Sequence, residues 1–329
     1  MAPRDVPSGR GRSEISVARR IRPAPTVRRF VVMDNDSLEV RGLTRTFGDL
    51  TAVDDVSFTA PPGLLTGFVG GNGAGKTTTM RMIMGVLAPT RGEVRCGGVP
   101  VTRADRRSFG YMPEERGLYP KQPVLDQLVY LARLRGISAP KARAEVLDML
   151  DRLGLAGRSK EHVEKLSLGN QQRVQIVAAL MGAPRLLVLD EPFSGLDPAA
   201  VDGMVDLLAE HTARGVPVLF SSHQLDLVER LCERLVILKA GRVMADGAPR
   251  DLQQAGALRH RLVVEGDAGW VRGVPGVHAV DVDGPVALLE LADDDSLQRL
   301  LAVGLERGVV RELTPLRPTL AQIYREVTA

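Results

Sequence analysis

From residue 38 the chain alternates between apolar and polar side chains. This period of two runs through residues 38–43 and 52–58, and it predicts two half-buried strands joined by a turn at residues 48–49. Residues 64–69 form a short continuous apolar run instead, as expected of a buried strand. The pattern predicts a small antiparallel sheet that is followed by the first strand of an α/β core.

The period becomes helical in the middle of the chain. Apolar side chains recur every three or four positions over residues 124–155, where Gly136 and Pro140 separate two predicted helices. We therefore expect a helical insert, at about residues 120–172, between two halves of the α/β core. Further strands of the core are predicted at residues 92–101, 108–113, 186–189 and 216–222.

The pattern changes again after about residue 250, where short strands and helices alternate. This order predicts a small α+β domain of the split-βαβ type at residues 255–329. We find no catalytic constellation in it and expect a structural or regulatory role. The strands are predicted at residues 261–265, 278–282, 286–291 and 309–313, and the helices at residues 296–305 and 319–327.

The most specific motif lies where the strand at 64–69 turns into a helix predicted at 78–86. The eight residues from Gly70 to Thr77 fit the phosphate-binding pattern G-x-x-x-x-G-K-[ST] in every fixed position. Backbone N–H groups and the helix dipole bind anions at such a junction, which favours a phosphate site over a glycine-rich turn with an incidental lysine. The expected nucleotide-binding residues are Gly70, Asn72, Gly73, Ala74, Gly75, Lys76, Thr77 and Thr78.

Polar side chains end two of the predicted strands. The four apolar residues 186–189 suit a strand that is buried on both faces of a parallel sheet, and Asp190 and Glu191 follow at its carboxyl end, where such sheets bind ligands. Asp190 and the Thr77 hydroxyl would bind Mg²⁺, whereas Glu191 would orient or activate the water that attacks the γ-phosphate. The alternative is a surface acidic pair that caps the next helix. His223 follows another predicted strand, again at its carboxyl end, and would donate a hydrogen bond to the γ-phosphate.

Phe47 lies in the turn between the first two predicted strands. An aromatic ring there would stack on an adenine base, because rings offer apolar area and a π face to any base. Ordinary packing in the core explains the residue equally well.

Composition and charge limit the alternatives. Eight arginines and two acidic residues give residues 1–32 a net charge of +6, so the rest of a chain with a total of +3 carries −3. We expect a disordered basic extension over residues 1–36, although contact with anionic lipid or nucleic acid, or a translation start at Met33, would also account for it. The slightly acidic body disfavours a nucleic-acid partner. Cys96 and Cys232 indicate neither a disulfide framework nor a zinc site.

Five motifs occur together in an order that is typical of one family. On these motifs the chain resembles the ATP-binding subunit of an ABC transporter, over about residues 38–247. The resemblance implies a P-loop ATPase core with a small β subdomain and a helical insert at residues 37–250, and ATP with Mg²⁺ as cofactors. The motifs are residues 70–77, 166–173, 187–191 and 194–197, together with His223.

The resemblance also implies how the site is completed. Two copies, or two similar ATPase subunits, would assemble head to tail around two ATP molecules. Ser167, the Gly169 backbone and Asn170 would then face the phosphate loop of the second copy from a helix N-terminus. The segment of residues 194–197, which includes Asp197, would lie along the same interface.

A separate integral-membrane permease is the other implied partner, at the cytoplasmic face of the cell membrane. The longest apolar runs of this chain are far shorter than the ~20 residues of a membrane span. We expect the permease to contact the helical insert and the loop at residues 114–119, where Leu118 and Tyr119 are apolar.

Several departures from the family pattern point to a sub-branch that resembles sodium-export and drug-export ATPases. The usual proline of the phosphate loop is Gly71, the usual second glycine of the signature motif is Leu168, and its glutamine is Asn170. Glu114 replaces the glutamine that is usual in the family. Its carboxylate would accept a hydrogen bond from water and bind Mg²⁺. The sequence that starts at Pro318 resembles the end of the C-terminal extension of that sub-branch.

Two other classes of function are weighed against an exporter ATPase. An ABC-type ATPase that acts on ribosomes or DNA is disfavoured by the single ATPase unit, by the lack of a long coiled-coil insert and by the acidic body. A P-loop kinase would leave the motif at residues 166–173 and His223 without a role.

Overall fold

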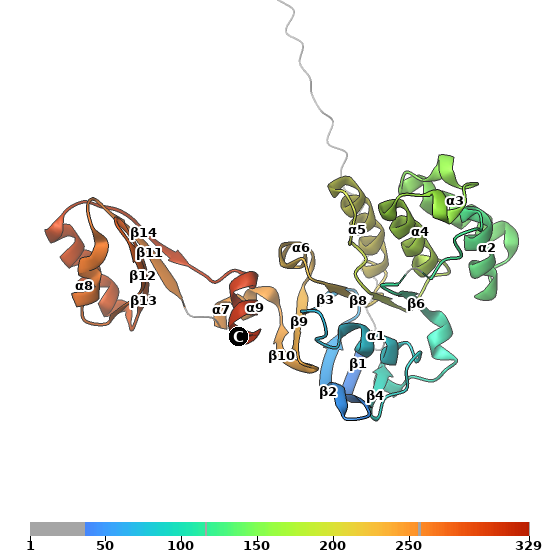
Figure 1. Cartoon of the computed structure of the whole chain (residues 1–329), viewed down its shortest axis with the longest axis horizontal. Helices are drawn as coiled ribbons and strands as arrows, with labels where there is room; N and C mark the ends of the chain where they lie inside the picture. The colour runs from blue at the N-terminus through green and yellow to red at the C-terminus, as the bar shows by residue number, and fades with distance from the viewer. Residues whose placement is uncertain (1–36, 116, 256–257, 329) are drawn as a thin grey trace, which may run out of the picture. The chain divides into compact units, whose positions relative to one another are not determined.

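The computed structural model describes residues 37–115, 117–255 and 258–328 (Figure 1). The basic extension predicted over residues 1–36 lies outside these described residues. The described ranges form a four-stranded antiparallel sheet, a six-stranded mixed sheet and a second four-stranded antiparallel sheet. None of the helices in these ranges has the length and apolar character of a membrane span.

The six-stranded sheet, with the strand order β10-β9-β3-β8-β7-β6, carries the α/β core. Its strands pair in parallel except β10, which pairs antiparallel with β9. Leu187 and Leu189 of β7 pack in one core, and Leu186 and Val188 pack in another, so this strand is buried on both faces as predicted. The strands are β3 (Leu65–Gly70), β6 (Phe109–Met112), β7 (Leu186–Leu189), β8 (Val218–Ser222), β9 (Arg234–Lys239) and β10 (Arg242–Gly247).

The first antiparallel sheet has the order β2-β1-β4-β5 and confirms the predicted hairpin. Its first two strands meet at a two-residue turn, with Phe47 opposite Leu50. Helix α1 (Lys76–Ile83) adds Met80 to the core that this sheet shares with one face of the large sheet. The strands are β1 (Leu38–Phe47), β2 (Leu50–Ala60), β4 (Arg91–Cys96) and β5 (Val99–Pro100).

Helix α1 is shorter than the sequence predicts. The apolar pattern extended it to residue 86, but the helix ends at Ile83 with Met84 as its C-cap. Gly85 follows with a φ of 71°, a left-handed conformation that commonly terminates helices. Val86 therefore lies beyond the helix, and 68% of it is exposed.

The helical insert contains the two helices that the sequence predicts. Gly136 follows the first, and Pro140 lies in the first turn of the second, where a missing backbone N–H costs little. Both pack against a third helix that begins within the signature motif and also contacts β6 (Figure 1). The three helices are α2 (Val124–Leu134), α3 (Ala139–Arg152) and α4 (Leu168–Leu180).

The second four-stranded sheet has the order β12-β13-β11-β14, and all its neighbours are antiparallel. This connectivity is that of a split βαβ unit, as the sequence suggested, but the first crossover is only a short 3₁₀ helix, η5 (Ala268–Gly273). The sheet, η5 and α8 enclose a core of their own. The other elements are β11 (Arg259–Val264), β12 (Val277–Asp283), β13 (Val286–Leu291), α8 (Asp294–Arg307) and β14 (Val310–Leu316).

Helix α9 (Leu320–Thr328) departs from the predicted organisation. The sequence pattern grouped it with the small domain, but Leu320 and Ile323 are buried in the main core of the ATPase part instead. They pack against α6 (Leu225–Leu231), α7 (Pro249–Ala255) and β10. Apolar side chains three residues apart form one face of a helix, and the ATPase core rather than the small sheet buries this face.

Replacing Leu320 with alanine is expected to lower the free energy of unfolding of the ATPase part by about 2–5 kcal/mol, because the fully buried side chain would leave a cavity. Urea denaturation followed by far-UV circular dichroism measures the loss. The fluorescence transition of Trp270, which packs in the core of the small domain, should stay in place. Leu316→Ala, at a partly exposed leucine, is the control, and an equal loss there would contradict the assignment of α9.

Candidate functional site

The phosphate loop connects the end of β3 to the start of α1. Gly75 is the N-cap of α1 and has a φ of 100°, which favours glycine. A Cβ atom on Gly75 would also lie 2.9 Å from the carbonyl oxygen of Ala52, so the loop is held close to β2. The backbone of the loop therefore stays accessible at a helix N-terminus, where anions bind.

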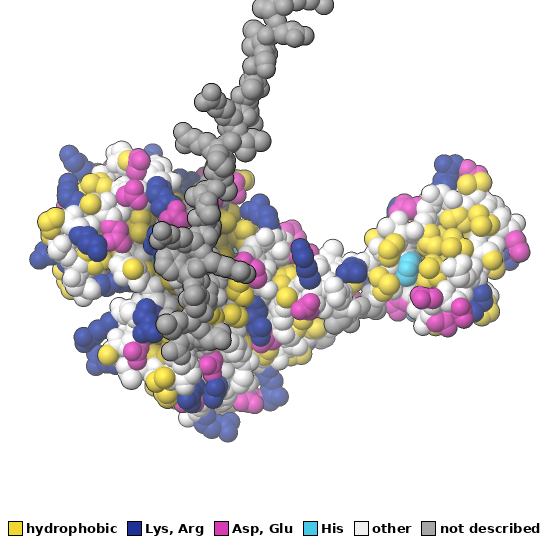
Figure 2. All heavy atoms as spheres, turned by 180° about the vertical axis from the view of Figure 1, so that it is seen from behind, with side chains coloured by type: hydrophobic (Ala, Val, Ile, Leu, Met, Phe, Trp, Pro, Cys, Tyr) yellow, Lys and Arg dark blue, Asp and Glu magenta, His cyan; other side chains and the backbone are white. Residues whose placement is uncertain are grey.

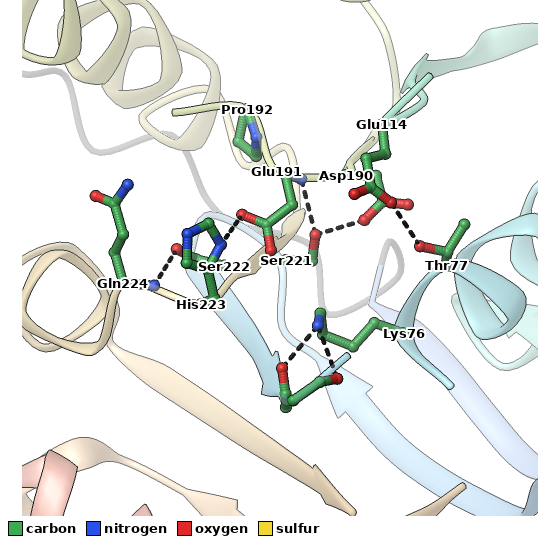
Figure 3. Close-up of polar contacts among 12 residues, drawn as sticks. Lys76, Thr77, Glu114, Asp190, Glu191, Pro192, Ser221, Ser222, His223 and Gln224 are labelled. Atoms are coloured by element: carbon green, nitrogen blue, oxygen red, sulfur yellow. Dashed lines mark hydrogen bonds and ion pairs between the residues drawn. The ribbon is translucent and has the colours of Figure 1, made fainter. Parts of the chain in front are cut away.

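The side chain of Lys76 is held across the phosphate loop by backbone carbonyl groups of that loop. Its side chain is largely buried, and Nζ donates to the carbonyl oxygens of Gly70 at 2.7 Å and Gly71 at 3.3 Å (Figure 3). An ammonium group has three N–H donors, so one remains for an oxygen of a bound phosphate. These contacts place the positive charge of Lys76 at the phosphate loop.

A cavity of about 1250 Å³ opens in front of the loop. Leu50, Thr51 and Ala52 of β2 and Ala240, after β9, line part of it, and the sequence did not predict these four residues. The cavity brings together most of the predicted site: Asn72, Gly73, Ala74, Gly75, Lys76, Thr77, Thr78, Glu114, Asp190, Glu191 and His223.

Asp190 has one satisfied and one unsatisfied carboxylate oxygen. Oδ1 accepts a hydrogen bond from the Ser221 hydroxyl at 2.6 Å, whereas Oδ2 is buried without a partner. Nearby, the Thr77 hydroxyl donates to Glu114 Oε2 at 3.4 Å (Figure 3). A buried anionic oxygen without a partner is costly, and hard oxygen donors are what Mg²⁺ binds. The donor set therefore fits a divalent cation.

Glu191 follows β7 in a strained backbone conformation. Its φ of 52° lies in the left-handed region, which costs a non-glycine residue about 1–2 kcal/mol. The backbone N–H donates to Ser221 Oγ at 2.8 Å, and Oε2 of the side chain contacts Nδ1 of His223 at 2.9 Å. Gln172 of α4 donates to the Glu191 carbonyl at 2.8 Å. Strain that is held by surrounding bonds is common at functional sites.

The hydroxyl group of Tyr111 of β6 has a raised pKa. Burial raises the pKa of its hydroxyl, and the nearby Asp190 carboxylate raises it further. Tyr111 therefore stays neutral at physiological pH and cannot serve as an anionic ligand.

Three residues of the predicted signature motif lie outside the cavity lining. Ser167 is the N-cap of α4, and its hydroxyl accepts from the backbone N–H of Asn170 at 3.4 Å. A Cβ atom on Gly169 would lie 2.9 Å from the carbonyl oxygen of Gly195, so this position requires glycine. The structure does not bring Ser167, Gly169 or Asn170 to the phosphate loop of the same chain.

Asp197 also lies outside the cavity lining. Its Oδ1 accepts from the backbone N–H of Ala200 at 2.9 Å and so caps α5 (Pro198–Thr212), and its Oδ2 pairs with Arg173 at 2.9 Å. These contacts fix the turn that precedes α5.

Phe47 is not part of the cavity lining either. The residue is 45% exposed, so the alternative that it packs in the core is wrong. The guanidinium of Arg45 lies 4.5 Å from the ring centroid and covers one face of the ring by a cation–π contact.

Ser221 is the residue that the sequence interpretation missed most clearly. It lies between the two carboxylates in Figure 3, and it is fully buried. One signal was present in the sequence: Ser221 is two positions before His223, and alternate residues of a strand face the same side of the sheet.

The phosphate loop, the carboxylates of Asp190 and Glu191 and the largely parallel sheet together define a P-loop nucleoside triphosphatase. Residues 53–194 match the ABC transporter family, and residues 247–328 match the C-terminal domain of DrrA1-3-like ATP-binding proteins. The chain belongs to the family of ABC transporter ATP-binding proteins, of the branch that contains export ATPases, and it hydrolyses ATP.

Similar proteins support this assignment along the chain. The ABC transporter ATP-binding protein YhaQ of Bacillus subtilis is 38% identical over 88% of this chain and 97% of its own length. The Nod factor export ATP-binding protein I of Rhizobium etli is 36% identical over 89% of this chain and 93% of its own length. A solved ATP-binding subunit of an ABC transporter matches with a TM-score of 0.61 and 34% identity over 66% of this chain and 92% of that one.

Proposed function

We propose that this chain powers a separate membrane permease in an exporter and hydrolyses Mg-ATP in a dimer at the cytoplasmic face of the membrane. The observation that carries the ATP chemistry is the buried, unpartnered Oδ2 of Asp190, close to the loop that holds Lys76. An anion-binding loop beside an unsatisfied carboxylate is complementary to a phosphate and a cation together.

We assign the cation to Thr77, Asp190 and Glu114, whose oxygen atoms are the available hard donors. When bound, Mg²⁺ neutralises charge on the β- and γ-phosphates. Glu114 in place of a neutral side chain adds a negative charge next to Thr77, which strengthens the attraction for a divalent cation.

The hydrolytic step is assigned to Glu191 and His223. Glu191 orients the attacking water and accepts its proton, because it is the carboxylate of the site whose two oxygens are not committed to Ser221 or Thr77. His223 uses Nδ1 for Glu191, so its Nε2 is left to contact the γ-phosphate. Lys76 binds the same phosphate from the loop.

A second copy supplies the remaining contacts in this proposal. Ser167, Gly169 and Asn170 lie at the N-terminus of α4 but do not line the cavity of their own chain, which suits donors to a neighbouring site. A bacterial ABC transporter cassette, MJ0796, that has this fold is described as dimeric, with a TM-score of 0.59 over 64% of this chain and 98% of that one.

The charge distribution supports this proposal over action on ribosomes or DNA. On the face seen in Figure 2, basic and acidic side chains are intermixed over the described part of the chain, with no separate basic stripe. Binding to a phosphate backbone needs basic residues that are clustered on one face.

A second cavity, of about 660 Å³, is the site we assign to the permease. It lies between β6 and the helical insert, and its walls include Leu118, Leu131, Leu134 and the basic residue Arg107. Leu134 is 67% exposed, and Tyr119 next to Leu118 is 59% exposed. A short helix with an apolar face and an acidic side chain, on the cytoplasmic side of the permease, complements these walls.

The proposal is tested by purifying tagged protein from gently solubilised membranes of its native cell. We expect a polytopic membrane protein in stoichiometric amount, and we expect Leu134→Asp to reduce its recovery about tenfold or more, because a charged side chain in place of an exposed leucine opposes docking of an apolar helix face. Leu305→Asp in α8 is the matched control, since Leu305 is 68% exposed. Recovery of ribosomal or DNA-repair proteins without a permease would reassign the function.

A further inference from the structure

We propose that Ser221 is a positioning residue that sets both carboxylates of the hydrolytic site through one hydroxyl group. The inference rests on the proposed roles of Asp190 and Glu191. It adds a residue that is not among the nucleotide and cation ligands assigned above, on a strand that the motifs of this chain do not include.

The sheet register places Ser221 between the two acidic residues. Strands β7 and β8 are parallel neighbours, with Leu189 opposite Phe220, so the residues that follow each of them meet at the carboxyl edge. Ser221 Oγ lies 2.6 Å from Asp190 Oδ1 and 2.8 Å from the backbone nitrogen of Glu191 (Figure 3).

The direction of both hydrogen bonds is fixed by chemistry. The Glu191 backbone N–H can only donate, so the Ser221 hydroxyl accepts there. The single hydrogen of the hydroxyl is then available to Asp190 Oδ1, which as a carboxylate oxygen accepts it. Ser221 therefore links a strained backbone and a buried anion in one chain of hydrogen bonds.

For Asp190, the bond determines which oxygen is free. Because Ser221 occupies Oδ1, the rotation of the carboxylate is set, and Oδ2 remains as the buried oxygen without a partner. This is the oxygen that we assign to the cation. The two oxygens are chemically equivalent, so what the hydroxyl holds is the plane of the carboxylate. Without it the carboxylate can turn about its Cβ–Cγ bond, and the preorganised donor is lost.

For Glu191, the bond supports the left-handed turn. A φ of 52° takes the backbone N–H out of the strand pairing, and Ser221 Oγ satisfies it. The turn sets where the side chain starts, and Oε2 then reaches His223. A change at Ser221 is therefore transmitted to the group that orients the attacking water.

Ser222 offers a matched comparison on the same strand. It is 2% exposed, and its hydroxyl accepts from the backbone N–H of Gln224 at 3.0 Å. This bond supports the turn before α6, and Ser222 has no contact with a carboxylate among its described hydrogen bonds. A purely structural role of a buried serine should therefore give Ser221 and Ser222 variants the same behaviour.

The test compares Ser221→Ala and Ser222→Ala in the full chain, by steady-state ATP hydrolysis at several Mg²⁺ concentrations. We expect Ser221→Ala to lower kcat about 10- to 100-fold and to raise the Mg²⁺ concentration for half-maximal activity, as loss of partners behind metal ligands commonly does. Ser222→Ala should change both by about twofold or less. Ser221→Cys, which keeps a side chain of the same shape but is slightly larger and donates weakly, should resemble Ser221→Ala, and it serves if the alanine variant does not fold.

A second readout does not depend on turnover. In a Glu191→Gln background, ATP affinity is measured with and without Mg²⁺ for each serine variant. We expect Ser221→Ala to leave the affinity without Mg²⁺ unchanged and to reduce the gain that Mg²⁺ provides, with no change for Ser222→Ala.

The outcomes separate this inference from the proposed function. The inference would be overturned if Ser221→Ala and Ser221→Cys kept the kcat and the Mg²⁺ requirement of the original chain. It would also be overturned if Ser222→Ala lost as much activity as Ser221→Ala. If Glu191→Gln itself hydrolyses ATP at the original rate, the proposed role of Glu191 fails instead, whatever the serine variants do.

Discussion

Glutamine in place of Glu191 is expected to lower kcat for ATP hydrolysis by about 10²- to 10⁴-fold, the range that a positioned acid or base contributes. The amide keeps the size of the side chain and still donates or accepts a hydrogen bond with His223, which now contacts Glu191 at 2.9 Å. It cannot accept a proton from water. ATP binding should persist, because the contacts of Lys76 and Thr77 are unaffected, and a stable ATP-bound dimer should accumulate.

The measurement is phosphate release together with size-exclusion chromatography in the presence of ATP. Glu115→Gln provides the control, because Glu115 is highly exposed and pairs only with Arg81 among the described residues. Hydrolysis by Glu191→Gln within about tenfold of the original rate would mean that another group activates the water.

Alanine in place of Lys76 should weaken ATP binding itself. The ammonium group lies at the phosphate loop, where a hydrogen bond between charged groups contributes about 1.5–3 kcal/mol, or roughly 10- to 100-fold in Kd. The substitution also leaves the carbonyl oxygens of Gly70 and Gly71 without their donor. Arginine should not restore binding, because its planar guanidinium does not replace a compact point charge at this position.

Binding of a fluorescent ATP analogue measures the loss, with melting temperature as the check on folding. Lys141→Ala, at an exposed lysine of α3, removes the same charge far from the loop in sequence and should leave the Kd unchanged. An unchanged Kd in Lys76→Ala would exclude the assigned phosphate contact.

The sequence predicted the strands and the phosphate loop because their signals are local. The four apolar residues before Asp190 indicated a doubly buried strand, and the loop from Gly70 to Thr77 carries its spacing within eight residues. The sequence also predicted that Asp190 and Glu191 lie at the ligand-binding edge of the sheet, because parallel strands end at one edge.

Features that depend on distant contacts were missed. The local sequence offered only the spacing of Ser221 from His223, whereas the hydrogen bonds of Ser221 to Asp190 and Glu191 follow from the register of β8 against β7. Phe47 could be placed in the turn, but its exposure and its contact with Arg45 depend on how the hairpin packs. The end of α1 was missed although its signal is local, because the left-handed Gly85 ends the helix before Val86, to which the apolar period continues.

The burial of α9 has a consequence for how the protein is made. A ribosome synthesises the chain from its N-terminus, and domains generally begin to fold as they emerge. Leu320 and Ile323 belong to the core of the ATPase part, yet they are translated after the whole small domain. The nucleotide site is therefore assembled on a scaffold whose last buried side chains arrive late in translation. A premature stop codon between β14 and α9 would release a chain in which α6, α7 and β10 lack the helix that packs against them, a substrate for chaperones and proteases rather than a slower ATPase.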